Sequence, residues 1–182
     1  MDIRSKFTKK LGIYGAVIVL IVLLDQLTKF LAVKYLQPVG SVPLLKGVFH
    51  LTYLENPGAA FGIFSDKPWI FQICSVVGIL ALFAYLFWDV SLLDDKGEDG
   101  KYPSIPFWSG LCLAFIVGGG IGNMIDRIAL GYVVDFFDFT LINFAVFNVA
   151  DCFVTVGAFW LIGLLALPLF TSKKQKKEPP TP

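Results

Sequence analysis

Four runs of mostly apolar residues recur along the chain, separated by more polar stretches. They cover residues 11–33, 69–88, 104–125 and 152–170. A helix that crosses a bilayer needs about 20 predominantly apolar residues, so each run is long enough. The pattern therefore predicts a mainly α membrane protein with four transmembrane helices.

The first run follows a basic N-terminus and could be mistaken for a secretory signal peptide. No small-residue cleavage site follows it, and residues 25–29 interrupt it while the helical pattern continues. We therefore interpret it as an uncleaved first span. Residues 172–182 are polar and contain several prolines, which predicts a disordered basic tail after a single domain over residues 1–171.

A period of two residues appears in the long connection at 34–68. Phe49, Leu51 and Tyr53 alternate with His50 and Thr52, and such alternation is typical of a strand. Non-helical backbone at membrane depth has to be buried in protein or face water. We therefore expect a short β structure at one membrane face.

The composition agrees with a membrane protein. Hydrophobic residues make up 56% of the chain and charged residues only 16%, whereas soluble domains contain about 45–50% apolar and about 25% charged residues. The formal net charge is +1, which predicts no nucleic-acid partner.

Basic residues gather at the two ends of the chain. They are Arg4, Lys6, Lys9, Lys10, Lys173, Lys174, Lys176 and Lys177. Basic flanking segments favour the cytoplasm, and four spans bring both termini to one side. The pattern therefore predicts cytoplasmic termini, with the connections 34–68 and 126–151 on the outer face.

Few residue types are present for catalysis or metal binding. His50 is the single histidine, so no Ser-His-Asp set and no histidine-rich metal site can form. Cys74, Cys112 and Cys152 each lie in an apolar run, where we interpret them as small core residues. We expect no metal and no cofactor. If the protein is an enzyme, carboxylates are its best acid–base groups.

Asp25 and Lys29 are charged residues inside the first span. They are four residues apart, so they share a helix face and can pair. Charges in a span are costly and usually face the interior of a helix bundle or a wet cavity. Two interpretations stay open: a structural ion pair, or a pair that orients a site near the outer interface.

Two further polar groups flank the second and third spans. Asn56 and Gly58 enclose a proline in a strong turn signal, and the small residues that follow let a backbone or a ligand approach closely. Asn123, Asp126 and Arg127 follow four glycines at the end of the third span. The glycines indicate close helix packing, and the Asp126–Arg127 dipeptide indicates first a local ion pair.

Asp135 and Asp151 border apolar stretches of the second outer connection and the fourth span. Two aspartates that meet in an apolar setting share a proton, because they cannot both ionise readily. One can then activate water while the other protonates a leaving nitrogen. Asn148 shares a helical face with Asp151 if the helix begins there. An ion pathway and purely structural carboxylates are the alternatives.

Four motifs together resemble the bacterial lipoprotein signal peptidase (signal peptidase II) family. They are LDQLTK at 24–29, ENPGAAFGIF at 55–64, GGGIGNMIDRIALGYVVDF at 118–136 and FNVADCFVTVG at 147–157. Each is moderately specific, and their occurrence in family order makes the set highly specific. The resemblance implies an intramembrane-type aspartic endopeptidase with four spans, a small extracytoplasmic β-cradle and an amphipathic outer segment.

The resemblance also implies the site and its substrate. Asp135 and Asp151 match the catalytic aspartates, and the residues that match site-supporting positions are Asn56, Gly58, Asn123, Arg127, Asn148, Asp25 and Lys29. Such enzymes remove signal peptides from prolipoproteins by cutting on the amino side of a cysteine that carries diacylglycerol. The family further implies globomycin-type inhibitors, no metal, and a place among the lipids of the bacterial cytoplasmic (inner) membrane, with the site toward the outer face. We expect a monomer.

Two alternatives from other classes fit parts of the pattern. A small transporter or channel subunit would use the buried charges as a polar path, but the second and fourth spans carry no acidic or basic residue. A noncatalytic membrane scaffold would use the glycines for helix packing and would tolerate Asp→Asn changes at positions 135 and 151.

Overall fold

A computed structural model describes residues 3–57, 73, 76–85 and 107–175 of the chain. Its long helices are α1 (Ile3–Leu31), α3 (Phe107–Ala129) and α4 (Val149–Gln175). A small sheet consists of β1 (Ser41–Leu45), β2 (Phe49–Asn56) and β3 (Val133–Asp138). Two short elements complete the order, namely η1 (Ala32–Leu36) after α1 and η3 (Thr140–Ile142) after β3.

Three of the predicted spans correspond to described helices that are long and apolar enough to cross a membrane. In the described part of the chain these are Lys9–Leu36, Phe107–Ala129 and Val149–Ala166. The predicted second span, 69–88, lies partly outside the described residues, and its described part includes the apolar helix Val76–Tyr85. The mainly helical membrane fold with a small sheet is thereby confirmed.

The helix ends differ from the predicted ends where polar residues continue a helix. Asp126 and Arg127, expected just past the third span, lie in the last turns of α3, which ends at Ala129. Gly131 follows with φ 84°, a left-handed conformation that suits glycine and ends a helix. The fourth helix begins at Val149, so Asp151 lies in its first turn. Backbone geometry, and not hydropathy, therefore sets these ends.

The sheet is antiparallel with the order β1-β2-β3. The strand expected from the alternation at 49–53 is confirmed as β2. Asp135, which we expected in a loop, lies on β3. Val133, Val134 and Phe136 are all buried there, so β3 is covered on both faces and lacks the alternation that predicts a half-buried strand.

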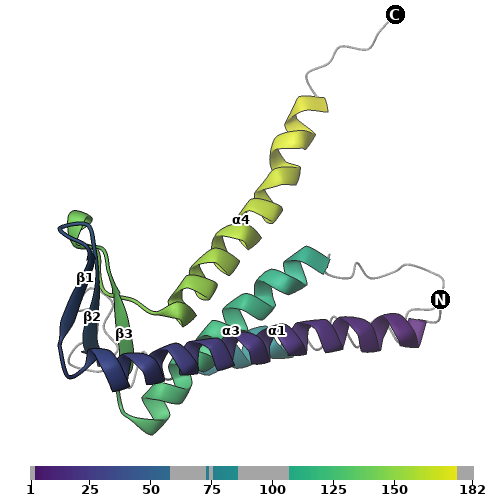
Figure 1. Cartoon of the computed structure of the whole chain (residues 1–182). Helices are drawn as coiled ribbons and strands as arrows, with labels where there is room; N and C mark the ends of the chain where they lie inside the picture. Colours follow the sequence, from purple (N-terminus) through teal and green to yellow (C-terminus); the bar gives the residue numbers. More distant parts are fainter. Residues whose placement is uncertain (1–2, 58–72, 74–75, 86–106, 176–182) are drawn as a thin grey trace, which may run out of the picture.

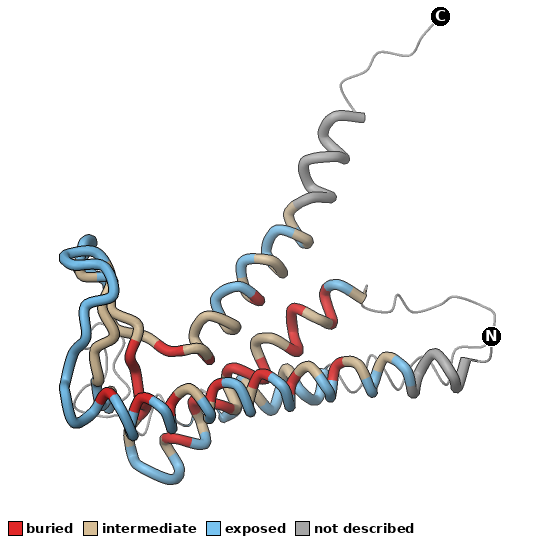
Figure 2. The backbone as a smooth tube through the Cα atoms, in the orientation of Figure 1, coloured by how far each residue is buried: buried red, intermediate tan, exposed pale blue. Residues whose placement is uncertain are grey.

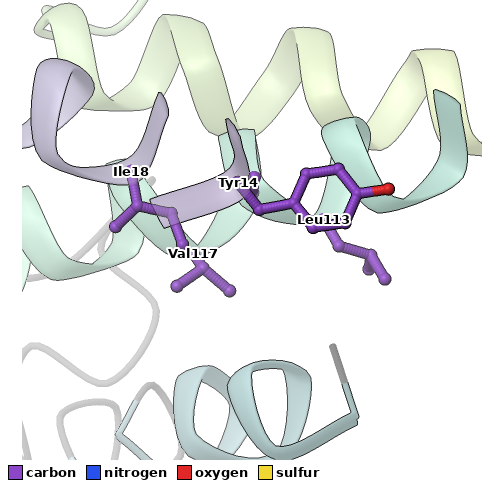
Figure 3. Close-up of a cluster of buried hydrophobic side chains, with 5 residues drawn as sticks. Tyr14, Ile18, Leu113 and Val117 are labelled. Carbon is purple, nitrogen blue, oxygen red and sulfur yellow. The ribbon is translucent and has the colours of Figure 1, made fainter. Parts of the chain in front are cut away.

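The helices pack closely through one apolar cluster and through small residues. Tyr14 and Ile18 of α1 contact Leu113 and Val117 of α3 in this cluster, which Figure 3 shows. The glycines of α3 face its neighbours: Cβ atoms at Gly118 and Gly122 would crowd α1, and one at Gly119 would crowd α4. In a bilayer such close contact supplies much of the attraction between helices.

The sheet is joined to the end of α1. The π-helical turn η1 buries Ala32 and Leu36 against Val134 and Phe136 of β3. In Figure 1 the strands run across the direction of α1, while the N-terminal end of α1 and the C-terminal end of α4 point away from the sheet. Figure 2 shows buried segments where β3 meets the helices. The polar site lies in this region.

Candidate active site

Asp135 is held on β3 by two amide groups. Asn148 Nδ2 donates to its Oδ1 at 2.6 Å, and Asn56 Nδ2 donates to its Oδ2 at 2.8 Å. The Asp135 residue is only 1% exposed. Both carboxyl oxygens therefore have fixed orientations, and β2 and the start of α4 hold them from two sides.

Asp151 and Asn148 form a reciprocal cap at the start of α4. The backbone N–H of Asp151 donates to Asn148 Oδ1 at 3.0 Å, and the backbone N–H of Asn148 donates to Asp151 Oδ2 at 3.2 Å. This is the geometry of a capping box, in which residues three apart satisfy each other's free backbone donors. The cap fixes Asp151 and leaves Asn148 Nδ2 free to reach Asp135.

Asn148 and Asn123 connect the two aspartates. Asn148 contacts Asp135 through its amide and Asp151 through its backbone. Asn123 Nδ2 donates to Asp151 Oδ1 at 2.7 Å, and Asn148 Nδ2 also lies 3.0 Å from Asn123 Oδ1. The residues expected to share a site thus come together from β2, α3, β3 and α4.

Burial changes the acidity of Asp135. Removal from water is the main cause that raises the pKa of its carboxyl from 3.8 to about 6, and the negative charge of Asp151 adds to the rise. Hydrogen bonds from Asn56 and Asn148 oppose it. The pKa of Asp135 therefore lies closer to neutral pH, where a carboxyl group can both give and take up a proton.

A second buried cluster lies behind the site and is centred on Lys29. Its ammonium group lies 2.8 Å from Asp25 Oδ2 and 3.1 Å from Asp126 Oδ2, and it donates to Asn123 Oδ1 at 2.8 Å. The predicted Asp25–Lys29 pair is confirmed. Because Lys29 is shared by two acids, Asp126 also belongs to this cluster.

The two acids of this cluster each hold backbone next to a site aspartate. Asp25 Oδ1 accepts from the N–H of Ala150, directly before Asp151, at 2.9 Å. Asp126 Oδ2 accepts from the N–H of Val134, directly before Asp135, at 3.0 Å. Lys29 therefore connects, through one acid each, to the backbone beside both site aspartates.

Gln26 is a site-supporting residue that the sequence analysis missed. Its amide donates to Asp126 Oδ1 at 2.9 Å and to the Gly122 carbonyl at 3.2 Å. The available signal was its position: an uncharged polar side chain beside Asp25, within an otherwise apolar span.

Arg127 lies beside the aspartates and next to an apolar groove. Its guanidinium interacts electrostatically with Asp151 and Asp135, and it donates from Nη1 to the Asn123 carbonyl at 3.4 Å. The groove has a volume of about 340 Å³ and is lined, besides Arg127, by Ile73, Val76, Val77, Met124 and Ile128. Gly58 and the small residues after it lie outside the described residues.

No metal cluster is formed by the described residues. Within these ranges, no group of three or more His, Cys, Asp or Glu side chains is arranged to hold an ion. The donors around Asp135 and Asp151 are asparagine amides and backbone N–H groups, which orient carboxylates for proton transfer.

Comparisons with known proteins agree with this architecture. Residues 17–167 match the family model of signal peptidase (SPase) II. The chain is 45% identical to a lipoprotein signal peptidase of Caldanaerobacter subterraneus over 83% of this chain and 93% of the relative. It is 41% identical to one of Brevibacillus brevis, over 90% and 99%.

Two solved structures of bacterial membrane enzymes have a similar fold. One bacterial membrane enzyme aligns with a TM-score of 0.68 at 28% identity, over 94% of this chain and 95% of the other. A second aligns with a TM-score of 0.67 at 28% identity, over 85% of this chain and 92% of the other.

The helices, the sheet and the family match together define a membrane-embedded peptidase. The chain belongs to the signal peptidase II family, whose members remove signal peptides from prolipoproteins. The transporter and scaffold alternatives are thereby set aside.

Proposed function

We propose that Asp135 and Asp151 are the catalytic dyad of this peptidase. The observation that carries the proposal is their common attachment to Asn148, whose amide holds Asp135 while its backbone N–H holds Asp151. Asparagine cannot take up a proton at working pH, so it orients both carboxyl groups without competing for the shared proton.

Proton transfer follows from the difference between the two environments. Buried Asp135 holds the shared proton, and the more exposed Asp151 acts as the general base that takes a proton from water. The water oxygen forms a bond to the scissile carbonyl carbon, and Asp135 donates a hydrogen bond to the carbonyl oxygen. A carboxyl proton then passes to the amide nitrogen as the C–N bond breaks, releasing the signal peptide with a new carboxylate.

The substrate is proposed to be a prolipoprotein whose cysteine carries diacylglycerol, cut on the amino side of that cysteine. The apolar groove beside Arg127 supports this, because it offers acyl chains a surface next to the dyad. Arg127 is proposed to hold a substrate carbonyl or a polar headgroup, and the small residues after Gly58 to admit the substrate backbone. Globomycin-type peptides would compete for the same site.

The proposed topology has cytoplasmic termini and an outer site in the bacterial cytoplasmic membrane. Its support is the basic content of both ends, together with α1 and α4 ends that point away from the sheet. Residues 1–171 are proposed to act as one monomeric domain, with 172–182 as a tail.

Lys29 is proposed as a positioning residue for the dyad. An ammonium group can only donate hydrogen bonds, so Lys29 requires that the oxygen of the Asn123 amide faces it. The Asn123 NH₂ group then faces Asp151, where it donates at 2.7 Å. Through Asp25 and Asp126, the same ammonium group also steadies the backbone beside both aspartates.

Substitution of each aspartate tests the dyad. We expect Asp135→Asn and Asp151→Asn each to lower turnover by about 10²–10⁴-fold, the usual contribution of a general acid or base. The assay uses purified protein in vesicles, a diacylglyceryl-modified prolipoprotein peptide, and mass spectrometry of both products.

Asp138→Asn is the matched control for these variants. Asp138 lies on the same strand, but its carboxylate accepts from Thr52 Oγ1 at 2.7 Å on the sheet. We expect near-normal turnover from this variant. Wild-type turnover by either dyad variant, with full membrane insertion, would remove the assignment.

A further inference from the structure

The far end of the sheet carries a cluster of exposed apolar side chains, here called the sheet tip. It combines the β1–β2 turn with the segment after β3. Leu141 and Ile142 are each 67% exposed, and the other exposed apolar members are Leu44, Leu45, Val48 and Phe144. A soluble protein rarely exposes so many large apolar side chains together without a binding partner.

The sheet tip is a built structure and not a loose loop. The N–H of Leu141 donates to the Val48 carbonyl at 3.3 Å, which joins its two segments. Behind them, Phe49 contacts Phe139 at 4.7 Å between ring centroids, and Phe147 stacks on Phe139 at 5.9 Å and meets Phe144 at 5.7 Å. The apolar side chains are therefore presented on a packed aromatic base.

A polar row crosses one face of the same sheet. Ser41 Oγ and Thr52 Oγ1 lie 2.8 Å apart, and Thr52 Oγ1 donates to Asp138 Oδ2 at 2.7 Å. The register places Ser41 opposite Thr52, and His50 opposite Asp138. One face is thus suited to water, while the end of the sheet is suited to an apolar medium.

We propose that the sheet tip inserts into the outer part of the lipid bilayer and anchors the sheet beside the helices. In Figure 1 the strands run across the direction of α1 at its end, so the tip extends sideways over the lipid that surrounds the spans. Lys46 lies exposed in the β1–β2 turn, where its ammonium group can meet lipid phosphates. The anchor fixes β3, and with it Asp135, at the depth where a lipid-attached peptide is presented.

The inference rests on the proposed outer-face topology and substrate, but its test measures only lipid contact and so does not depend on the dyad. A spin label at Ile142→Cys is placed in vesicles of phosphatidylcholine and phosphatidylglycerol that contain this protein alone. Collisions with oxygen, which concentrates in lipid, are compared with collisions with a water-soluble nickel chelate. Leu20→Cys, 64% exposed within α1, serves as the lipid control, and Ser41→Cys on the polar row serves as the water control.

We expect the label at 142 to follow the label at 20, with collisions shifted toward oxygen, while the label at 41 favours the chelate. Protein with native cysteines only supplies the background. Retained cleavage by the Ile142→Cys protein shows that it is folded. A label at 142 that behaves like the label at 41 would overturn the proposal, and is the result expected if the tip instead binds another protein.

Discussion

A methyl group added to Gly119 should separate the two aspartates without touching either. A Cβ atom there would lie 2.8 Å from Val154 Cγ2 and closer still to the backbone carbonyl oxygen of Ala150. Ordinary contact begins at 3.4 Å. The carbonyl belongs to the first turn of α4 and cannot rotate away as a side chain can, so α3 and α4 must move apart.

The size of the effect follows from this geometry. Clearing the contact needs a shift of roughly 1 Å, and overpacking of this kind costs about 1–3 kcal/mol of stability. Ala150 directly precedes Asp151, whereas Asp135 is held on β3, so the shift changes the distance between the carboxyl groups. A displacement of about 1 Å in a catalytic group typically lowers turnover by about 10²-fold.

The assay compares Gly119→Ala with Gly163→Ala at equal amounts of inserted protein. Gly163 lies on α4, and a Cβ atom added there would meet nothing within 4 Å. We expect the control to keep wild-type turnover and thermal stability. If Gly119→Ala cleaved the substrate as fast as Gly163→Ala, the close contact between α3 and α4 would not set the dyad geometry.

Four further outcomes follow from the proposed site. The pKa of Asp135 is about 6 in the folded protein, against an ordinary value of 3.8. This pKa should fall in Asp151→Asn, which removes a charge that raises it, and rise in Asn56→Ala, which removes a hydrogen bond that lowers it. Infrared titration of labelled carboxyl groups measures both shifts, and shifts of the opposite sign would contradict these causes. Because the folded pKa is raised, the carboxyl of Asp135 stabilises the fold fully below pH 3.8, and this contribution is lost as the pH rises through about 6. Lys29→Met should lower kcat more than it raises KM. It should also lower the free energy of unfolding by about 3–5 kcal/mol, since it removes the cation that pairs with two buried acids. An unchanged kcat in folded protein would show that Lys29 has a structural role only. Activity should persist in a strong chelator, and chelator-sensitive activity restored by a metal would refute the metal-free mechanism.

The helices were predictable from sequence because hydropathy alone determines whether a segment can enter a bilayer. The first, third and fourth apolar runs correspond to described helices, and the strand at 49–53 followed from alternation. β3 was not predictable in this way. Val134 and Phe136 pack with the η1 residues Ala32 and Leu36, and Val133 and Asp135 at the alternate positions are buried as well. A strand covered on both faces loses the period of two.

The site was predictable as a set of residues but not as an arrangement. Polar side chains in apolar runs are costly, which singled out Asp25, Lys29 and Asn123 without any coordinates. Spacing does not reveal that Lys29 connects to the backbone beside both aspartates, or that Asn148 caps α4 with Asp151. The contact between Asp25 and the backbone of Ala150 joins residues 125 positions apart, and only the folded chain shows it.

The most direct test of the dyad is the turnover of the double variant Asp135→Asn with Asp151→Asn, measured beside each single variant under single-turnover conditions. Groups that act as one unit show strongly non-additive losses, because removing either already disables the step. A dyad predicts that the double variant cleaves as slowly as the slower single variant and no more slowly. Losses that multiply would mean that the two carboxylates act independently, and would contradict the shared-proton mechanism.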